Sequence, residues 1–395
     1  MRILLCEWGT FNEPVIEKTL RDIGHFVRVI KREEAHKDDI EAEVLYLANA
    51  AREYHADIFF SVDYFNALAS AAKQAGILYY SWLFHLPQWN LYSYQAQLPC
   101  NRIFIFDRAQ IEELKRRNVQ TAQYLSLPAD KQLFENAMEG AATKKNKYQA
   151  DVSFVGSIYE SANNIFNHMK PEDRETETYK QLVELIKEKK FSYGRGVLRR
   201  GVSDEMVQFL AKATEGDRNN YFFAEREDIA LQSVLARKIT VEERKTVCRL
   251  LSRKFDMKVY TVSNTERYPE IINCGPVDFQ KQAPLIFNQS KINVYVTPRA
   301  IQTGIPGRVL EIIACQGFVL TNYQEDLAAE FEEGKEIVMY RSLEDLVAKT
   351  NYYLTHEEER QSIIRAGYEK VMREYNYAEK LRKILDTRSG SNFGF

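Results

Sequence analysis

Apolar and polar positions alternate along the first 130 residues in blocks that predict strands and helices in turn. The apolar run 2–8 (RILLCEW) has the length of a buried strand, and 13–24 (EPVIEKTLRDIG) has the period of an amphipathic helix ending at Gly24. Because the strand interiors are apolar rather than alternating, they are typical of a parallel sheet covered on both faces. Further strands are predicted at 26–30, 56–63, 77–85, 101–107 and 122–130, and further helices at 38–54, 64–76 and 109–118.

The pattern changes after a polar stretch at 135–150. The segment 151–161 (DVSFVGSIYES) begins a new strand and turn, but from 161 to 255 long charged amphipathic stretches contain hardly any strand signal, which indicates a helical insertion. After residue 255 the alternation of strand and helix patterns resumes. The predicted strands are 257–264, 292–297, 317–322 and 336–340, and the predicted helices are 306–316, 342–356 and a final helical stretch at 357–385.

These blocks predict an α/β fold with two Rossmann-like domains facing each other across a cleft. Ligands of open α/β sheets bind outside the carboxyl ends of the strands, so we expect the site in that cleft. The predicted parts are a first domain at 1–135, a linker at 136–150, a second domain at 151–370 that contains the insertion 161–255, and a C-terminal helix at 371–395 that crosses back to the first domain.

Composition narrows the classes of function. With 395 residues, of which 45% are hydrophobic, the chain is long enough for two cores. Its 54 basic and 56 acidic residues are spread along its length, so no basic field is available for nucleic acid. The five cysteines are scattered and never form a C-x-x-C pair, which favours reduced thiols over disulfides or zinc. With no apolar run long enough for a signal peptide or a membrane span, we expect a cytoplasmic protein.

The stretch 301–322 (IQTGIPGRVLEIIACQGFVLTN) carries the most informative chemistry. Pro306 and Gly317 bracket a predicted helix. Gly304 and Gly307 at its start leave room for a diphosphate to approach the backbone N–H groups and the positive end of the helix dipole. Arg308 offers a planar two-pronged donor for phosphate oxygens, and Glu311, one turn further, can accept from ribose hydroxyls. The alternative is a tight turn followed by a surface ion pair, and composition alone does not decide between them.

Several segments resemble CgeB-like glycosyltransferases, a family of GT-B architecture named after a spore maturation protein. The likeness is carried by FNQSKINVYVT, by QTGIPGRVLEIIACQGFVLTNYQEDL and by EEERQSIIRAGYEKV, and it extends upstream to NRIFIFDRAQIEELKRRN and YQADVSFVGSIYES. The resemblance implies transfer of a sugar from a nucleoside diphosphate sugar, with a UDP-sugar favoured. The second domain would hold the donor, and a protein or glycan acceptor would face the first.

Matched position by position, the resemblance places Gly304, Arg308 and Glu311 in the donor-holding segment. Gly156 and Ser157 match the glycine turn after the first strand of the donor domain, where backbone amides can reach a phosphate. Thr297 and Gln302 lie just ahead of the helix, where they could contact sugar or base, or serve as ordinary polar loop residues.

The sequence also departs from the family pattern. Related transferases often carry an acid eight positions before the residue matching Glu311, where this chain has Thr303, so no sugar-side carboxylate is assigned. Gln316 replaces a usual first glycine, and we expect Gly317 to make the turn instead. The family usually has an aspartate where His85 stands.

In the first domain, two residues are candidates for catalysis. His85 follows a predicted strand, and a neutral imidazole there could act as general base toward an acceptor hydroxyl, although a packing role is the alternative. Asp107 also ends a strand, but it competes for the role of helix N-cap, which we favour. Trp8 and Gly9 follow the first strand, and Trp8 could stack on a sugar ring or pack in the core.

The favoured interpretation is a glycosyltransferase. The chain contains no D-x-D pair to hold a divalent ion, so we expect metal-independent catalysis in which the helix dipole and Arg308 stabilise the leaving group. A non-catalytic nucleotide-sugar-binding assembly protein and a sugar-nucleotide epimerase remain alternatives. The insertion could bind a protein acceptor or a second subunit of a homo-oligomer, or it could be a solvated cap.

Overall fold

The structure is a computed structural model that describes residues 1–31, 39–133, 135, 139, 147–159, 166, 169–212 and 226–387. The chain divides into two compact units, each built on one six-stranded parallel sheet. The first contains Met1–Pro128 and the last helix, α17, and the described residues of the second lie within Ala129–Arg218 and Glu225–Glu374. The predicted α/β fold with two Rossmann-like sheets is therefore confirmed.

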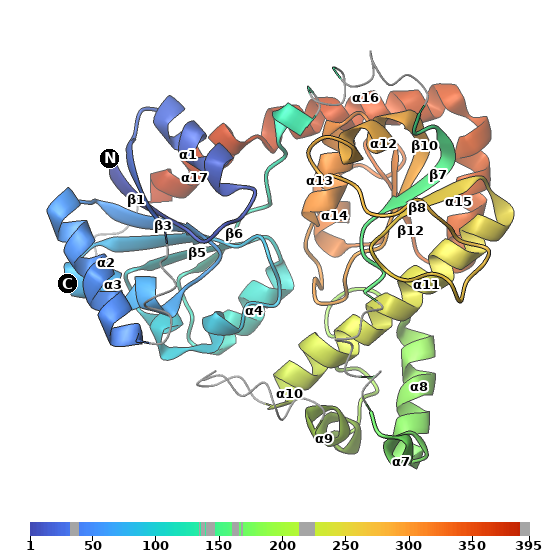
Figure 1. Cartoon of the computed structure of the whole chain (residues 1–395), viewed down its shortest axis with the longest axis horizontal. Helices are drawn as coiled ribbons and strands as arrows, with labels where there is room; N and C mark the ends of the chain where they lie inside the picture. Colours follow the sequence, from blue (N-terminus) through green and yellow to red (C-terminus); the bar gives the residue numbers. More distant parts are fainter. Residues whose placement is uncertain are drawn as a thin grey trace. The chain divides into compact units, whose positions relative to one another are not determined.

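The first sheet has the strand order β2-β1-β3-β4-β5-β6. Of the described helices, two cover one face and three cover the other (Figure 1), so both faces of the central strands are buried. The strands are β1 (Arg2–Glu7), β2 (Phe26–Lys31), β3 (Ile58–Val62), β4 (Leu78–Trp82), β5 (Asn101–Ile105) and β6 (Ala122–Tyr124). The helices are α1 (Glu13–Asp22) and α17 (Tyr377–Asp386) on one face, and α2 (Ile40–Tyr54), α3 (Asn66–Ala75) and α4 (Arg108–Arg116) on the other. Short helices η2 (Trp89–Tyr92) and η3 (Tyr94–Gln97) follow β4.

Helix α17 completes the first unit although it lies at the other end of the sequence. Its buried residues Leu381 and Ile384 join the cluster that contains Ile16 and Leu20 of α1. The Tyr377 hydroxyl donates to Asn12 Oδ1 at 2.9 Å. The first sheet therefore depends on α17 to cover one of its faces.

The second sheet has the order β12-β11-β10-β7-β8-β9, with every pair parallel. Its helices follow the apolar runs that the sequence predicts as strands. Strand β9 has only two residues, which is too short for such a prediction. The strands are β7 (Ala150–Val155), β8 (Met257–Tyr260), β9 (Ile272–Asn273), β10 (Ser290–Tyr295), β11 (Val319–Asn322) and β12 (Val338–Tyr340). The helices after β9 are α12 (Ala283–Gln289), α13 (Gly307–Ala314), α14 (Glu325–Glu330), α15 (Leu343–Thr355) and α16 (Glu357–Glu374).

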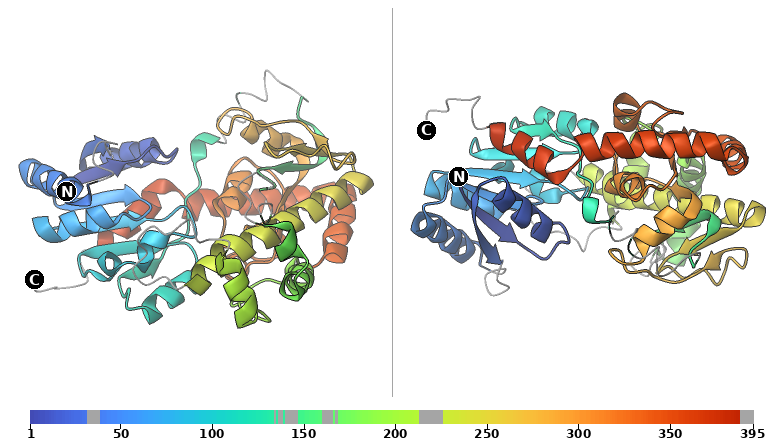
Figure 2. Two further views of the ribbon diagram at one scale, coloured as in Figure 1. Left: turned by 60° about the horizontal axis from the view of Figure 1, so that its bottom comes forward. Right: turned by 90° about the horizontal axis from the view of Figure 1, so that it is seen from above.

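A helical insertion connects β7 to β8, as predicted. Its last helix, α11, is shared between two cores: Ala236 and Ile239 belong to the core of the insertion, whereas Val247 and Leu251 pack under the sheet. Figure 2 shows α11 as a long helix that runs from the insertion to the sheet. The described elements of the insertion are α7 (Pro171–Arg174), α8 (Glu177–Lys189), α9 (Asp204–Lys212), α10 (Arg226–Ile229), the π-helical η4 (Ala230–Leu235) and α11 (Ala236–Lys254).

The turn after α13 differs from its prediction. Gln316, not Gly317, adopts the left-handed conformation, with φ of 53°. Gly317 is needed for a different reason, because a Cβ at this position would lie 2.6 Å from the carbonyl oxygen of Phe287. The glycine therefore allows a close approach of α12 to this turn, and the strained residue is the glutamine.

Two further features of the chain bear on its class. All five cysteines are free thiols, and four of them are buried. None of the helices in the described ranges combines the length and the apolar character that a membrane crossing requires.

Candidate functional site

The second sheet has a topological switch point between β7 and β10. From β7 the chain moves outward in one direction through β8 and β9, and from β10 it moves outward in the other direction through β11 and β12. Ligands of such sheets bind in the crevice where the two directions part, outside the carboxyl ends of the strands. Gly156 and Ser157 follow β7, and Thr297 follows β10, so these three predicted residues lie at the same edge.

The two loops at this edge are held in place by buried hydrogen bonds. Gly156 has φ of 152°, and its N–H donates to Tyr260 O at 3.0 Å. The N–H of Thr297 donates to Asn322 Oδ1 at 2.7 Å. The hydroxyl of Thr297 is buried and has no hydrogen-bond partner among the described residues. A buried polar group without a partner is costly, so Thr297 is suited to bonding a ligand at this edge.

Helix α13 points its N-terminus to the same side of the sheet, because it follows β10. Pro306 occupies the N-cap position, and no side chain caps the helix. Within the described part of the chain, the N–H groups of Gly307 and Arg308 have no hydrogen-bond partner, and neither has the buried Arg308 Nη1. Unpaired N–H groups and the positive end of the helix dipole make this position suitable for a phosphate.

Arg308 and Glu311 form the ion pair that their spacing predicts. Arg308 Nε lies 3.4 Å from Glu311 Oε2, and the side chains are 25% and 24% exposed. The Arg308 guanidinium lies over the ring of Phe279, 4.4 Å from its centre. Burial raises the pKa of Glu311, Arg308 lowers it, and Asp130 adds to the increase. Both side chains are partly exposed while held in a fixed geometry, which would allow each to contact a ligand.

The loop before α13 supplies the remaining predicted residues. Gln302 Oε1 accepts from Gly196 N of the insertion at 3.4 Å, and Gly304 O accepts from Gln324 Nε2 at 3.3 Å. Thr303, where the sequence lacks the expected acid, donates through Oγ1 to Asp326 Oδ2 at 3.1 Å. A buried carboxylate thus lies beside Thr303 after all. This carboxylate belongs to α14, more than twenty positions later in the sequence. Matching the chain to the family pattern position by position therefore could not identify it.

The corresponding loop of the first unit is already occupied by an internal anion. The Glu13 carboxylate accepts from the N–H groups of Trp8, Gly9 and Thr10, each at 2.9 Å. Glu13 is 2% exposed, so it fills the position that a phosphate would take after the first strand of a Rossmann-like sheet. The first unit is therefore poorly suited to a diphosphate at this loop, unlike the second.

His85 is paired with a carboxylate that sequence reasoning missed. Asp63, at the end of β3, is 1% exposed, and its Oδ2 accepts from His85 Nδ1 at 2.7 Å. Asp63 Oδ1 also accepts from the backbone N–H groups of Phe84 and His85, at 2.9 and 3.2 Å. The hydrogen bond to Asp63 raises the pKa of His85 although burial opposes it. With Nδ1 donating to Asp63, the other ring nitrogen is left to accept a proton.

Asp107 and Trp8 take structural roles in the first unit. The Asp107 carboxylate accepts from Gln110 N at 3.1 Å and caps α4, which is the role favoured from the sequence. The indole N–H of Trp8 donates to Val62 O at 2.8 Å, and the Trp8 and His85 ring centres are 6.2 Å apart. Trp8 remains 42% exposed, so it forms an aromatic wall beside the His85–Asp63 pair.

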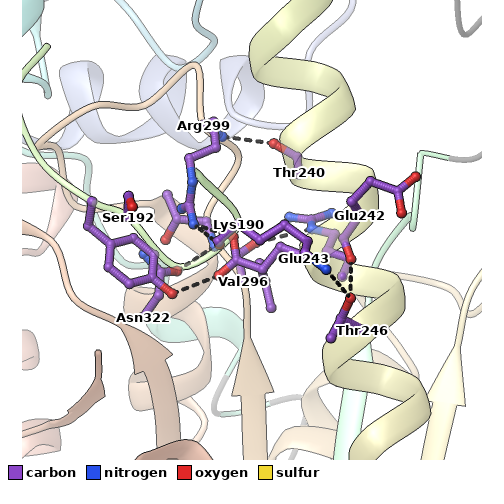
Figure 3. A network of polar contacts seen from close by, with 12 residues as sticks. Lys190, Ser192, Thr240, Glu242, Glu243, Thr246, Val296, Arg299 and Asn322 are labelled. Carbon is purple, nitrogen blue, oxygen red and sulfur yellow. Dashed lines mark hydrogen bonds and ion pairs between the residues drawn. The ribbon is translucent and has the colours of Figure 1, made fainter. Parts of the chain in front are cut away.

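A buried ion pair anchors the loop between β10 and α13 to the insertion. Glu243 of α11 pairs with Arg299, and both are almost completely buried. Arg299 N donates to Thr240 Oγ1 at 2.9 Å, and the Glu243 carboxylate accepts from the Tyr193 hydroxyl at 2.8 Å. Burial raises the pKa of Glu243 to about 7 although Arg299 lowers it. Figure 3 shows Thr240, Glu243 and Arg299 meeting between α11 and the loop after β10.

Comparisons with known proteins show what the chain is similar to. Residues 237–386, which run from α11 to the end of α17, match a family model described as glycosyl transferase-like. No curated protein matches the chain.

Three solved structures are similar over nearly the whole chain, although each shares little sequence. A glycosyltransferase from Rickettsia africae is 11% identical, with a TM-score of 0.52 and 99% of each chain covered. HepE from Anabaena, solved with UDP, is 10% identical with a TM-score of 0.54, covering 99% of this chain and 100% of that one. Sucrose-phosphate synthase from Thermosynechococcus elongatus is 11% identical, with a TM-score of 0.55 and 98% of each chain covered. The chain therefore has the GT-B fold, and residues 237–386 match a glycosyl transferase-like family model.

Proposed function

We propose that this protein is a GT-B glycosyltransferase of the CgeB-like kind, which transfers a sugar from a nucleoside diphosphate sugar to a protein or glycan acceptor without a metal ion. The observation that carries the proposal is the start of α13. Backbone N–H groups and Arg308 Nη1, which have no hydrogen-bond partner among the described residues, lie with the partly exposed Glu311 at the switch point of the second sheet. That combination matches a diphosphate followed by a ribose.

A UDP-sugar is the favoured donor. HepE, which has the same fold, was solved with UDP and with UDP-glucose. In this chain, the α13 N-terminus and Arg308 would bind the diphosphate, and Glu311 would accept from the ribose hydroxyls. Gly156, Ser157, Thr297, Gln302 and Gly304 would surround the phosphates and the sugar. As the sugar leaves, negative charge develops on the diphosphate, and the same donors would stabilise it.

The acceptor hydroxyl needs a base, and His85 is the candidate. Asp63 fixes the ring so that its second nitrogen can receive a proton from the acceptor. His85 and its partner belong to the first unit, whose β1–α1 loop is filled by Glu13 and so suits an uncharged part of a substrate better than a phosphate. Asp107 is buried as a helix cap and is the weaker candidate.

Titration of UDP into the protein by calorimetry tests the donor site. Glu311→Ala should weaken UDP binding by about 1–3 kcal/mol, the range for losing a charged hydrogen-bond partner, and Glu311→Gln should weaken it less. The matched control is Glu332→Ala, which removes the carboxylate of an exposed ion pair of the same spacing, Lys335–Glu332 at 3.0 Å. Equal UDP affinity in the wild type and in Glu311→Ala would exclude Glu311 from the site.

Turnover distinguishes an enzyme from a binder. UDP-glucose and related sugars should be hydrolysed slowly, and faster with lysate as the source of acceptor, in buffer containing EDTA. UDP binding with no turnover under any of these conditions would instead support a non-catalytic assembly protein. Conversion of UDP-GlcNAc to an epimer without acceptor would support an epimerase. Loss of turnover in EDTA that returns with added magnesium or manganese would contradict metal independence.

A further inference from the structure

Arg244 of α11 links the two loops that meet at the switch point. Its Nη1 donates to Ser157 O at 2.5 Å, and its Nε and Nη2 donate to Val296 O at 3.1 and 2.6 Å. Ser157 follows β7 and Val296 follows β10, so one guanidinium bridges the ends of both strands. No pattern along the chain indicates this role, because Arg244 lies within a charged amphipathic helix and is 87 positions from Ser157.

Arg244 is 3% exposed, and within the described residues no carboxylate forms an ion pair with it. The adjacent Glu243 pairs with Arg299, which is also 3% exposed. This buried group therefore contains two arginines and one glutamate. Carbonyl oxygens satisfy the donors of Arg244 but do not neutralise it, and a buried charge without a counterion is unfavourable.

The excess positive charge of this buried group lies at the two loops that meet at the switch point. The carbonyl oxygens of Ser157 and Val296 accept from Arg244, so they point toward its guanidinium. The cation therefore lies directly beside the two loops that follow β7 and β10. In a region from which water is largely excluded, such a charge acts over a longer range than it would at the surface.

We propose that Arg244 is a positioning residue for the donor: its buried cation attracts the diphosphate through the local field, and its three hydrogen bonds fix the two loops around it. The inference rests on the proposed function, since it needs a diphosphate at the switch point. It also gives the helical insertion a role, because α11 brings Arg244, Glu243 and Thr240 from the insertion to the donor loops.

The test compares UDP with uridine, which share the base and the ribose but differ in the diphosphate. Dissociation constants for both are measured by calorimetry with the wild type, Arg244→Gln, Arg244→Lys and Arg253→Gln, after thermal unfolding has shown that each variant is folded. Arg244→Gln should weaken UDP at least tenfold and leave uridine within twofold. Arg244→Lys, which keeps the charge, should recover most of the UDP affinity.

Arg253→Gln provides the control. It removes a positive charge from the same helix at an exposed position, where Arg253 pairs with Glu270, so UDP and uridine should both bind as they do to the wild type. If Arg244→Gln does not fold, Arg244→Lys still decides, because a lysine that keeps the charge should leave the UDP affinity close to that of the wild type and the uridine affinity unchanged. Equal weakening of UDP and uridine in either Arg244 variant, or a loss of UDP affinity in Arg253→Gln as large as in Arg244→Gln, would overturn the inference. Failure of the wild type to bind UDP would instead overturn the proposed function.

Discussion

Asp63 shows how one buried side chain can define the chemistry of its neighbour. It adopts a left-handed backbone conformation, with φ of 59°, and its carboxylate accepts from His85 Nδ1 and from two backbone N–H groups. A strained backbone in a buried residue is retained where the surrounding bonds require it, which is common at functional sites. The pair therefore orients His85 and favours its protonated form.

Asp63→Asn should lower the pKa of His85, because the charge that favours the imidazolium is removed. A general base acts in its neutral form, so turnover should rise with pH through the pKa of His85, and the variant should reach its plateau at lower pH. The maximal rate should fall about 10²-fold or more, because the ring loses its fixed orientation. NMR titration of His85 and the pH profile of turnover provide the measurements.

The control for that experiment is His85→Ala, which should lose a similar factor in turnover, keep its affinity for UDP and show no acidic limb. An unchanged pH profile in Asp63→Asn would remove the pair from the mechanism.

The raised pKa of His85 also makes the stability of the fold depend on pH. Since the folded-state pKa of His85 is raised, its pairing with Asp63 stabilises the fold at low pH, and this contribution is lost as pH rises through that pKa.

At the scale of elements, the turn between α13 and β11 fixes the helix that carries the proposed donor site. Gln316 N donates to Ile313 O at 2.9 Å and Gly317 N donates to Ile312 O at 2.9 Å, so the last carbonyls of α13 are satisfied by the turn. The neighbouring Asn293 of β10 donates to Phe287 O at 2.9 Å and ties α12 to the same place. The position of α13 thus depends on a turn with no room for a side chain at Gly317.

Gly317→Ala should destabilise the second unit by about 1–3 kcal/mol, the range for overpacking a buried site, because the new Cβ would meet the Phe287 carbonyl oxygen. Gln316→Gly should be neutral or stabilising, since it relieves a left-handed non-glycine residue. Thermal unfolding followed by circular dichroism compares the two neighbouring variants. A larger loss in Gln316→Gly than in Gly317→Ala would show that the roles of the two residues are reversed.

At the scale of the molecule, the first unit is completed by the far end of the chain. Leu381 of α17 is 0% exposed, and it packs in the same cluster as Trp82. The three tryptophans, Trp8, Trp82 and Trp89, all belong to the first unit. Their fluorescence therefore reports the unfolding of that unit, to which α17 contributes.

Leu381→Ala should lower the stability of the first unit by about 2–5 kcal/mol, as expected for a large-to-small change in a core. The midpoint of the tryptophan fluorescence transition in urea should fall accordingly. The control is Leu346→Ala, which truncates a leucine of equal burial in the core of the second unit and should leave this transition in place. A fluorescence transition unaffected by Leu381→Ala would mean that α17 does not stabilise the first unit in solution.

The sequence by itself determined the two parallel sheets, the helical insertion and the spacing of Arg308 and Glu311. These features are local: apolar periodicity fixes each element, and three positions along one helix always place two side chains together. The role of Asp107 as the N-cap of α4 was predicted for the same reason, because a cap bonds to an N–H group in the first turn of its own helix.

Only the tertiary structure decided what faces these residues. The carboxylate beside Thr303 comes from Asp326, the partner of His85 is Asp63, and the cation behind Ser157 comes from Arg244. Each pairing joins residues that are distant in sequence. The first two meet because parallel strands bring their carboxyl ends to one edge of a sheet, whereas Arg244 is brought to Ser157 by helix α11 of the insertion. A pattern along the chain records the period of each element but not which elements become neighbours, so such pairings appear only once the sheets have formed.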